Sequence, residues 1–133
     1  MKTGPLSGVR VLEFAGIGPG PFCGMLLSDM GADVIRIDRN NKGSSKHVIE
    51  ARGKRSIELN LKNPDDIKVC IKLIKKTDIL QEGFRPGVME RLGLGPDTCL
   101  ETNPKIVYGR MTGFGQDGPM SKAAGHDLNY IAM

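Results

Sequence analysis

The residues best suited to acid–base chemistry are His126 and Asp127, which follow Gly125 near the end of a 133-residue chain. An imidazole has an unperturbed pKa near 6.5, so His126 can both accept and donate a proton around neutrality. Asp127 could orient the loop or stabilise the imidazolium, whereas His47 lies in a polar segment and is expected to have no catalytic role. His126 lies seven residues before the final Met133, so we expect a second catalytic group to be absent from this chain.

Composition narrows the class of partner. The formal net charge is +4, which favours an anionic ligand. Aromatic residues make up only 5% of the chain and do not alternate with arginines, so a small phosphorylated ligand is favoured over nucleic acid. No apolar run is long enough to span a membrane and no signal-peptide pattern is present, which predicts a cytoplasmic protein. The widely spaced Cys23, Cys70 and Cys99 indicate reduced thiols and no metal site.

Strand-like and helix-like segments alternate along the chain. The expected strands share short apolar or alternating patterns and span residues 9–14, 33–38, 56–61, 78–80 and 106–110. The expected helices span 22–30, 64–76, 88–92 and 97–101, and residues 39–54 are expected to form a long loop. This alternation predicts one α/β domain over residues 1–133, with a Rossmann-like, mostly parallel sheet flanked by helices.

Ligands of such sheets bind beyond the carboxyl ends of the strands. The expected functional loops therefore begin after those ends, at Gly16–Pro21, from Arg39 onward, at Gly83–Arg85 and at Thr112–His126.

The first of these loops suggests a dinucleotide site, because Gly16 and Gly18 follow a strand and Asp38 ends the next one. The fingerprint Gly-x-Gly-x-x-Gly requires a third glycine where this chain has Pro21. Pro19 also stiffens a loop that would have to fold its amides around a pyrophosphate. We therefore do not favour nicotinamide binding, and the glycines alone fit a tight strand-to-helix turn.

Several segments, taken together, resemble the family III coenzyme A transferases over nearly the whole chain, and most closely their α-methylacyl-CoA racemase branch. The matching segments occur in order and are Gly4–Glu13, Gly18–Cys23, Leu27–Arg39, Arg52–Ile57, Phe84–Gly93, Gly113–Gln116 and Gly125–Tyr130. The last of them resembles the racemase branch's catalytic histidine motif. The resemblance implies an N-terminal part of a larger, interlocked-dimer fold.

The resemblance also implies a coenzyme A site. Arg39 and Arg91 occupy the family's phosphate-binding positions, and guanidinium groups suit phosphate oxygens because they offer paired donors. The remaining implied binding residues are Ile17, Gly18, Leu59, Asn60, Leu61, Lys62, Gly83, Phe84, Arg85, Gly125, Leu128, Asn129 and Tyr130. We expect Lys42, Lys46, Lys54 and Arg55 to be ordinary solvated charges.

The implied reaction is a 1,1-proton transfer at the α-carbon of a 2-methylacyl-CoA, through an enolate. Its catalytic residues in this chain are His126 as the acid–base group and Asp127 as the neighbour that assists it, and no prosthetic group is implied. Relatives form homodimers and carry a catalytic aspartate beyond the position of Met133, so we expect this chain alone to have little or no isomerase activity. Two alternatives stay open. One is a transferase that moves coenzyme A between carboxylic acids, and the other is an inactive fragment that still binds coenzyme A.

Overall fold

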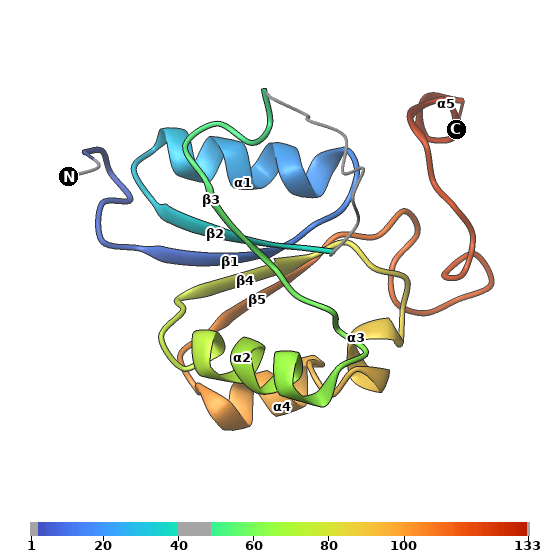
Figure 1. The fold of residues 1–133 in the computed structure, drawn as a ribbon. Coiled ribbons are helices and arrows are strands. Elements are labelled where there is room, and N and C mark those ends of the chain that lie inside the picture. The colour runs from blue at the N-terminus through green and yellow to red at the C-terminus, as the bar shows by residue number, and fades with distance from the viewer. Residues whose placement is uncertain (1–2, 40–48, 133) are drawn as a thin grey trace.

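The computed structural model describes residues 3–39 and 49–132, which fold around a five-stranded parallel sheet (Figure 1). The strands are β1 (Arg10–Phe14), β2 (Asp33–Asp38), β3 (Arg55–Glu58), β4 (Ile79–Glu82) and β5 (Val107–Arg110). Their order in the sheet is β3-β2-β1-β4-β5, and every neighbouring pair is parallel. The predicted Rossmann-like parallel sheet is therefore confirmed.

Helices cover both faces of the sheet. Helix α1 (Pro19–Asp29) lies on one face, while α2 (Pro64–Ile74) and α4 (Pro96–Thr102) lie on the other (Figure 1). The short α3 (Val88–Arg91) follows β4, and α5 (Asp127–Ile131) comes near the end of the chain. Within residues 3–39 and 49–132, no helix is long and apolar enough to cross a membrane.

The larger core lies between the sheet and helices α2 and α4. Leu12 and Phe14 of β1 and Leu80 of β4 pack there against Cys70 and Ile74 of α2. The predicted apolar face of α2 is confirmed, since Ile67 and Ile71 pack against the same cluster. The face of the sheet under α1 has a smaller apolar cluster, made of Val11, Ala32 and Val34. Polar side chains occupy part of the remaining space on that face.

Helix α2 begins as its sequence predicts. The Asn63 side chain accepts a hydrogen bond from the Asp65 backbone N–H at 3.0 Å, Pro64 takes the first helical position, and Asp65 and Asp66 lie at the positive end of the dipole.

Helix α1 begins three residues earlier than predicted, at Pro19 instead of Phe22. Proline is well tolerated in a first helical turn, where backbone N–H groups lack partners within the helix, so Pro19 and Pro21 both fit there. Gly18 precedes the helix with φ 74°, a conformation that suits glycine, and no side chain of the described residues caps this end.

Other boundaries differ by a few residues. Strand β3 ends at Glu58 because the chain turns at Asn60–Asn63, where the Asn63 N–H donates to the Asn60 carbonyl at 2.8 Å. Of the expected loop 39–54, residues 40–48 lie outside the described part of the chain, and with them Lys42, Lys46 and His47.

The burial of two cysteines gives a test of the fold. Cys70 and Cys99 have no exposed surface, and burial raises the pKa of both thiols to about 11, whereas Cys23 is only partly buried. Because the thiolate is the reactive form, an aromatic disulfide reagent at pH 8 should modify one thiol quickly and two slowly. Cys23→Ser should abolish the fast phase, and rapid reaction of three thiols in the native protein would contradict this packing.

Candidate functional site

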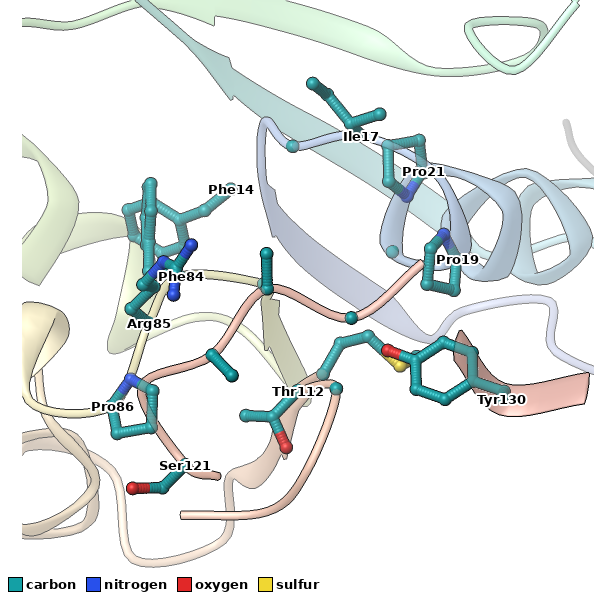
Figure 2. A pocket seen from close by; sticks show the side chains of 18 residues that line it. Phe14, Ile17, Pro19, Pro21, Phe84, Arg85, Pro86, Thr112, Ser121 and Tyr130 are labelled. Atoms are coloured by element: carbon teal, nitrogen blue, oxygen red, sulfur yellow. The ribbon is translucent and has the colours of Figure 1, made fainter. Parts of the chain in front are cut away.

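A pocket of about 200 Å³ lies at the carboxyl ends of β1, β4 and β5. Its walls come from the segments that follow these strands, as Figure 2 shows with Ile17, Pro19 and Pro21 on one side and Phe84, Arg85 and Pro86 on another. The full lining is Phe14, Gly16, Ile17, Pro19, Gly20, Pro21, Gly83, Phe84, Arg85, Pro86, Met111, Thr112, Gly113, Ser121, Ala123, Ala124, Gly125 and Tyr130.

The topology explains why a pocket forms there. The β1-to-β2 connection carries α1 over one face of the sheet, and the β4-to-β5 connection carries α4 over the other (Figure 1). The chain therefore leaves neighbouring strands β1 and β4 in opposite directions, which opens a crevice at their carboxyl ends. Three of the four loops expected to be functional contribute to the pocket, and none of the described residues of the loop from Arg39 onward lines it.

The inner wall is aromatic. Phe14 is buried, and its ring meets that of Phe84 edge to face with centroids 6.3 Å apart. The exposed Arg85 side chain donates a hydrogen bond to the Lys122 carbonyl, which ties the β4 loop to the segment that follows β5. The pocket thus combines an apolar floor with a cation at its rim, as a ligand with an apolar portion and an anionic portion requires.

Glycines let the segment after β5 pack closely against α5. A Cβ atom on Gly125 would lie 1.9 Å from Tyr130 Oη and 3.0 Å from the Gly113 Cα, so both backbones approach each other where no side chain fits. The Tyr130 ring also packs on Phe114, with centroids 5.7 Å apart.

His126 is placed beside this pocket without lining it. It is the N-cap residue of α5, and its backbone N–H donates to Asn129 Oδ1 at 3.0 Å. Its side chain and those of Asp127 and Leu128 are exposed, while the preceding Gly125 lines the pocket. The predicted acid–base role of His126 and Asp127 stays a prediction.

The two arginines that are predicted to bind phosphate follow the carboxyl ends of strands, which is the edge of the sheet where the pocket lies. Arg39 directly follows the carboxyl end of β2 and is exposed. Arg91 ends α3, and its guanidinium lies over the backbone of Gly87, where an added Cβ would come within 3.2 Å of Nη1. Gly87 follows Pro86 of the pocket wall, so this loop brings one of the two predicted arginines close to the pocket.

The predicted binding residues divide into two groups. The structure brings together in the pocket Ile17, Gly83, Phe84, Arg85, Gly125 and Tyr130. Segment 59–62 does not join them, because Leu59 is buried in the larger core, Leu61 packs against it, and Asn60 Oδ1 accepts from the Lys62 N–H. Gly18, at the N-cap of α1, borders the lining residues Ile17 and Pro19.

Lys54 was expected to be a solvated charge, and this expectation is wrong. Only 2% of its side-chain surface is exposed, and its ammonium lies 2.6 Å from Glu13 Oε2. A glutamate within the apolar run Val9–Phe14 was the available signal that a buried cation must be near. Arg55, by contrast, is exposed and paired with the exposed Asp33, as expected for a surface charge.

A second acidic group is buried next to the pocket. Glu82, at the end of β4, accepts from the Phe84 N–H at 2.7 Å and from Arg110 Nε at 3.3 Å. Burial raises the pKa of Glu82, and the two hydrogen bonds and the charge of Arg110 oppose that rise. Arg110 also bonds Glu90 of α3, so a single guanidinium joins the ends of β4 and β5 to the helix that carries Arg91.

No group of three or more His, Cys, Asp or Glu side chains is placed to hold a metal ion within residues 3–39 and 49–132.

The parallel sheet and the crevice at the carboxyl ends of β1 and β4 define an α/β protein with a pocket where ligands of such sheets bind. The chain belongs to CoA-transferase family III, whose model matches residues 6–133. It is 53% identical over 128 residues to an alpha-methylacyl-CoA racemase of Mus musculus, a match that covers 96% of this chain and 33% of the relative. A CaiB/baiF CoA-transferase family protein of Caenorhabditis elegans is 44% identical, with 96% and 37% covered.

A solved structure agrees. The crystal structure of a hypothetical protein from Mycobacterium tuberculosis superposes with a TM-score of 0.88 at 35% identity, over 98% of this chain and 39% of that one. The chain thus spans about a third of the length of the curated relatives it matches.

The contact between Glu82 and Arg110 leads to a prediction about how the stability of an Arg110→Met variant depends on pH. Arg110→Met removes the cation that opposes the rise in the Glu82 pKa, so this pKa should rise further. A carboxyl group whose pKa is higher in the folded than in the unfolded protein stabilises the fold at pH values below its unfolded-state pKa. This stabilisation is lost as the pH rises through its folded-state pKa. The variant should therefore lose stability from pH 5 to pH 8 relative to the unaltered protein, by about 1–3 kcal/mol, in urea unfolding.

The control is Arg52→Met, which breaks the exposed Arg52–Asp29 pair. It should change stability little at any pH. An Arg110→Met profile parallel to that of the unaltered protein would contradict the coupling of Glu82 to Arg110.

Proposed function

We propose that this chain forms the coenzyme A-binding part of a 2-methylacyl-CoA racemase. The observation that carries the proposal is the pocket at the β1–β4 crevice, because it unites predicted binding residues from three separate segments in a chain of CoA-transferase family III. The racemase branch is favoured over the transferases because the similarity to alpha-methylacyl-CoA racemases reaches 53% and 49% identity, against 38% for a succinyl-CoA–L-malate CoA-transferase subunit.

The chemical groups of coenzyme A match the groups that this site presents. Its diphosphate and 3′-phosphate would be held by Arg39 and Arg91, with Arg85 at the rim. Its uncharged pantetheine arm would cross the apolar wall made by Phe14, Phe84 and the prolines that line the pocket. An acyl-CoA substrate is also consistent with the family.

In the proposed reaction, His126 removes the proton from the α-carbon, and the electron pair moves onto the thioester oxygen to give an enolate. A proton returned to the opposite face inverts the centre, so the whole protein requires a second acid–base group. Backbone amides near the start of α5 would stabilise the enolate, and Asp127 would stabilise the imidazolium. We also propose that the full-length protein is cytoplasmic and homodimeric.

Phosphate binding by the two arginines is tested by titrating coenzyme A into the protein by calorimetry. Arg39→Met and Arg91→Met should each weaken binding about tenfold, because each removes a charge-assisted contact, and raised salt should weaken binding of the unaltered protein. Arg55→Met is the matched control, since Arg55 is an exposed arginine at the amino end of β3, away from the carboxyl edge of the sheet. Equal affinities for all four proteins would overturn the assignment.

Racemase chemistry is tested in the intact protein by deuterium wash-in at the α-carbon of a 2-methylacyl-CoA. His126→Ala should abolish the exchange and leave coenzyme A affinity within about twofold, because the imidazole acts on the acyl group. His47→Ala, a change of the chain's other histidine, should leave exchange intact. Exchange that survives His126→Ala would overturn the role of His126, whereas absence of exchange together with a trapped aspartyl thioester that forms independently of His126 would instead establish the transferase function.

A further inference from the structure

A buried polar cluster lies directly behind one wall of the pocket, on the α1 face of the sheet. Its members are Glu13 of β1, Gln81 of β4 and Lys54, which precedes β3. Glu13 and Gln81 are partners in the register of neighbouring strands, so their side chains emerge side by side. None of the three lines the pocket, and the function proposed above does not use them.

The cluster is built around one carboxylate oxygen. Glu13 Oε2 accepts from Lys54 Nζ at 2.6 Å and from Gln81 Nε2 at 3.1 Å. Both donors are also bonded to the first turn of α1, Lys54 to the Pro21 carbonyl at 2.8 Å and Gln81 to the Gly20 carbonyl at 3.0 Å. The carboxylate is therefore linked to two consecutive carbonyls of the pocket wall through one cation and one amide.

Burial makes this arrangement costly to maintain unless the charges stay paired. The side chains of Lys54 and Glu13 are 2% and 1% exposed, and Glu13 Oε1 has no hydrogen-bond partner among the residues that the structure describes. Burial raises the pKa of Glu13, while Lys54 opposes that rise. Well-packed apolar residues often serve stability as well as a buried ion pair does, so stability alone does not account for the cluster.

The N-terminus of helix α1 has no side-chain cap within the described residues, so the bonds that Lys54 and Gln81 donate to its first-turn carbonyls are the side-chain hydrogen bonds seen at this end. Gly24 lets the helix sit directly on the cluster, because a Cβ at this position would lie 1.8 Å from Glu13 Oε2 and 2.7 Å from Gln81 Nε2.

The segment that precedes β3 in the sequence lies along the same helix. Arg52 pairs with Asp29 at the C-terminal end of α1, and Lys54 bonds Pro21 at its N-terminal end. One short segment thus contacts the helix at both ends, with the exposed pair at one end and the buried bond from Lys54 at the other.

We propose that Lys54 is a positioning residue for coenzyme A binding: with Glu13 and Gln81 it holds the Gly20–Pro21 turn, and so the Gly16–Pro21 wall of the pocket, in the shape that accepts the ligand. The inference rests on the function proposed above. Lys54 acts from behind the wall and touches no ligand.

The first test measures coenzyme A affinity by calorimetry at a temperature where each variant is fully folded. Lys54→Met should weaken coenzyme A binding about tenfold, because it removes the strong hydrogen bond from Lys54 to the Pro21 carbonyl that holds the pocket wall in shape. Lys68→Met, which breaks the exposed pair with Asp65 on α2, should leave affinity unchanged. Unchanged affinity in Lys54→Met would overturn the proposal.

A double variant separates positioning from stability. Glu13→Gln combined with Lys54→Met removes both buried charges, so it should unfold at a higher urea concentration than Lys54→Met alone. It still lacks the bond to the Pro21 carbonyl, and its affinity should stay about tenfold reduced. If affinity returns together with stability, the cluster is structural and the proposal is wrong.

Amide hydrogen exchange tests the anchoring without ligand. Lys54→Met should speed exchange in the first turns of α1, at residues 22–25, and leave α2 unaffected. If the unaltered protein fails to bind coenzyme A, the proposed function fails, and this measurement still decides whether Lys54 anchors the helix. Unchanged exchange at residues 22–25 would refute the anchoring.

Discussion

The position of β1 at the centre of the parallel sheet is the constraint on which the site depends. The chain leaves β1 through α1 on one face and leaves the neighbouring β4 toward α4 on the other, so it diverges at the carboxyl ends of these two strands. Residues far apart in sequence meet at that edge, among them Ile17, Arg85 and Gly125. The apolar strand β1 needs packing on both sides, and this packing places the crevice beside the buried Phe14.

Much of this architecture follows from local patterns. The capping residues of α2, its apolar spacing and the alternation of strands and helices each reflect interactions between residues near in sequence. The rule that ligands bind beyond parallel strands then selects the edge of the sheet where the pocket lies and most of the segments that line it. Local patterns are less reliable at element ends, as α1 shows, because prolines are accepted within a first turn as readily as before it.

The rest depends on contacts between distant residues. Lys54 and Glu13 are 41 positions apart, and nothing near Lys54 in sequence distinguishes it from the exposed Arg55 beside it. Within the expected loop Thr112–His126, the lining residues Thr112, Ser121, Ala123 and Ala124 carry no chemical signature of their own. Which residues of this loop line the pocket depends on how the segment after β5 folds back across the strand ends. Arg110 is similar, since its role depends on two glutamates on different elements.

The close contact at Gly24 has a consequence for how the sequence can vary. A side chain at position 24 and a carboxylate at position 13 cannot occupy the same space, and a carboxylate at 13 without an ammonium at 54 leaves a bare charge in the interior. Positions 13, 24, 54 and 81 therefore constrain one another as a set. A viable exchange at one of them requires a compensating exchange at another, so in descendants of this chain the four should change together or remain as they are.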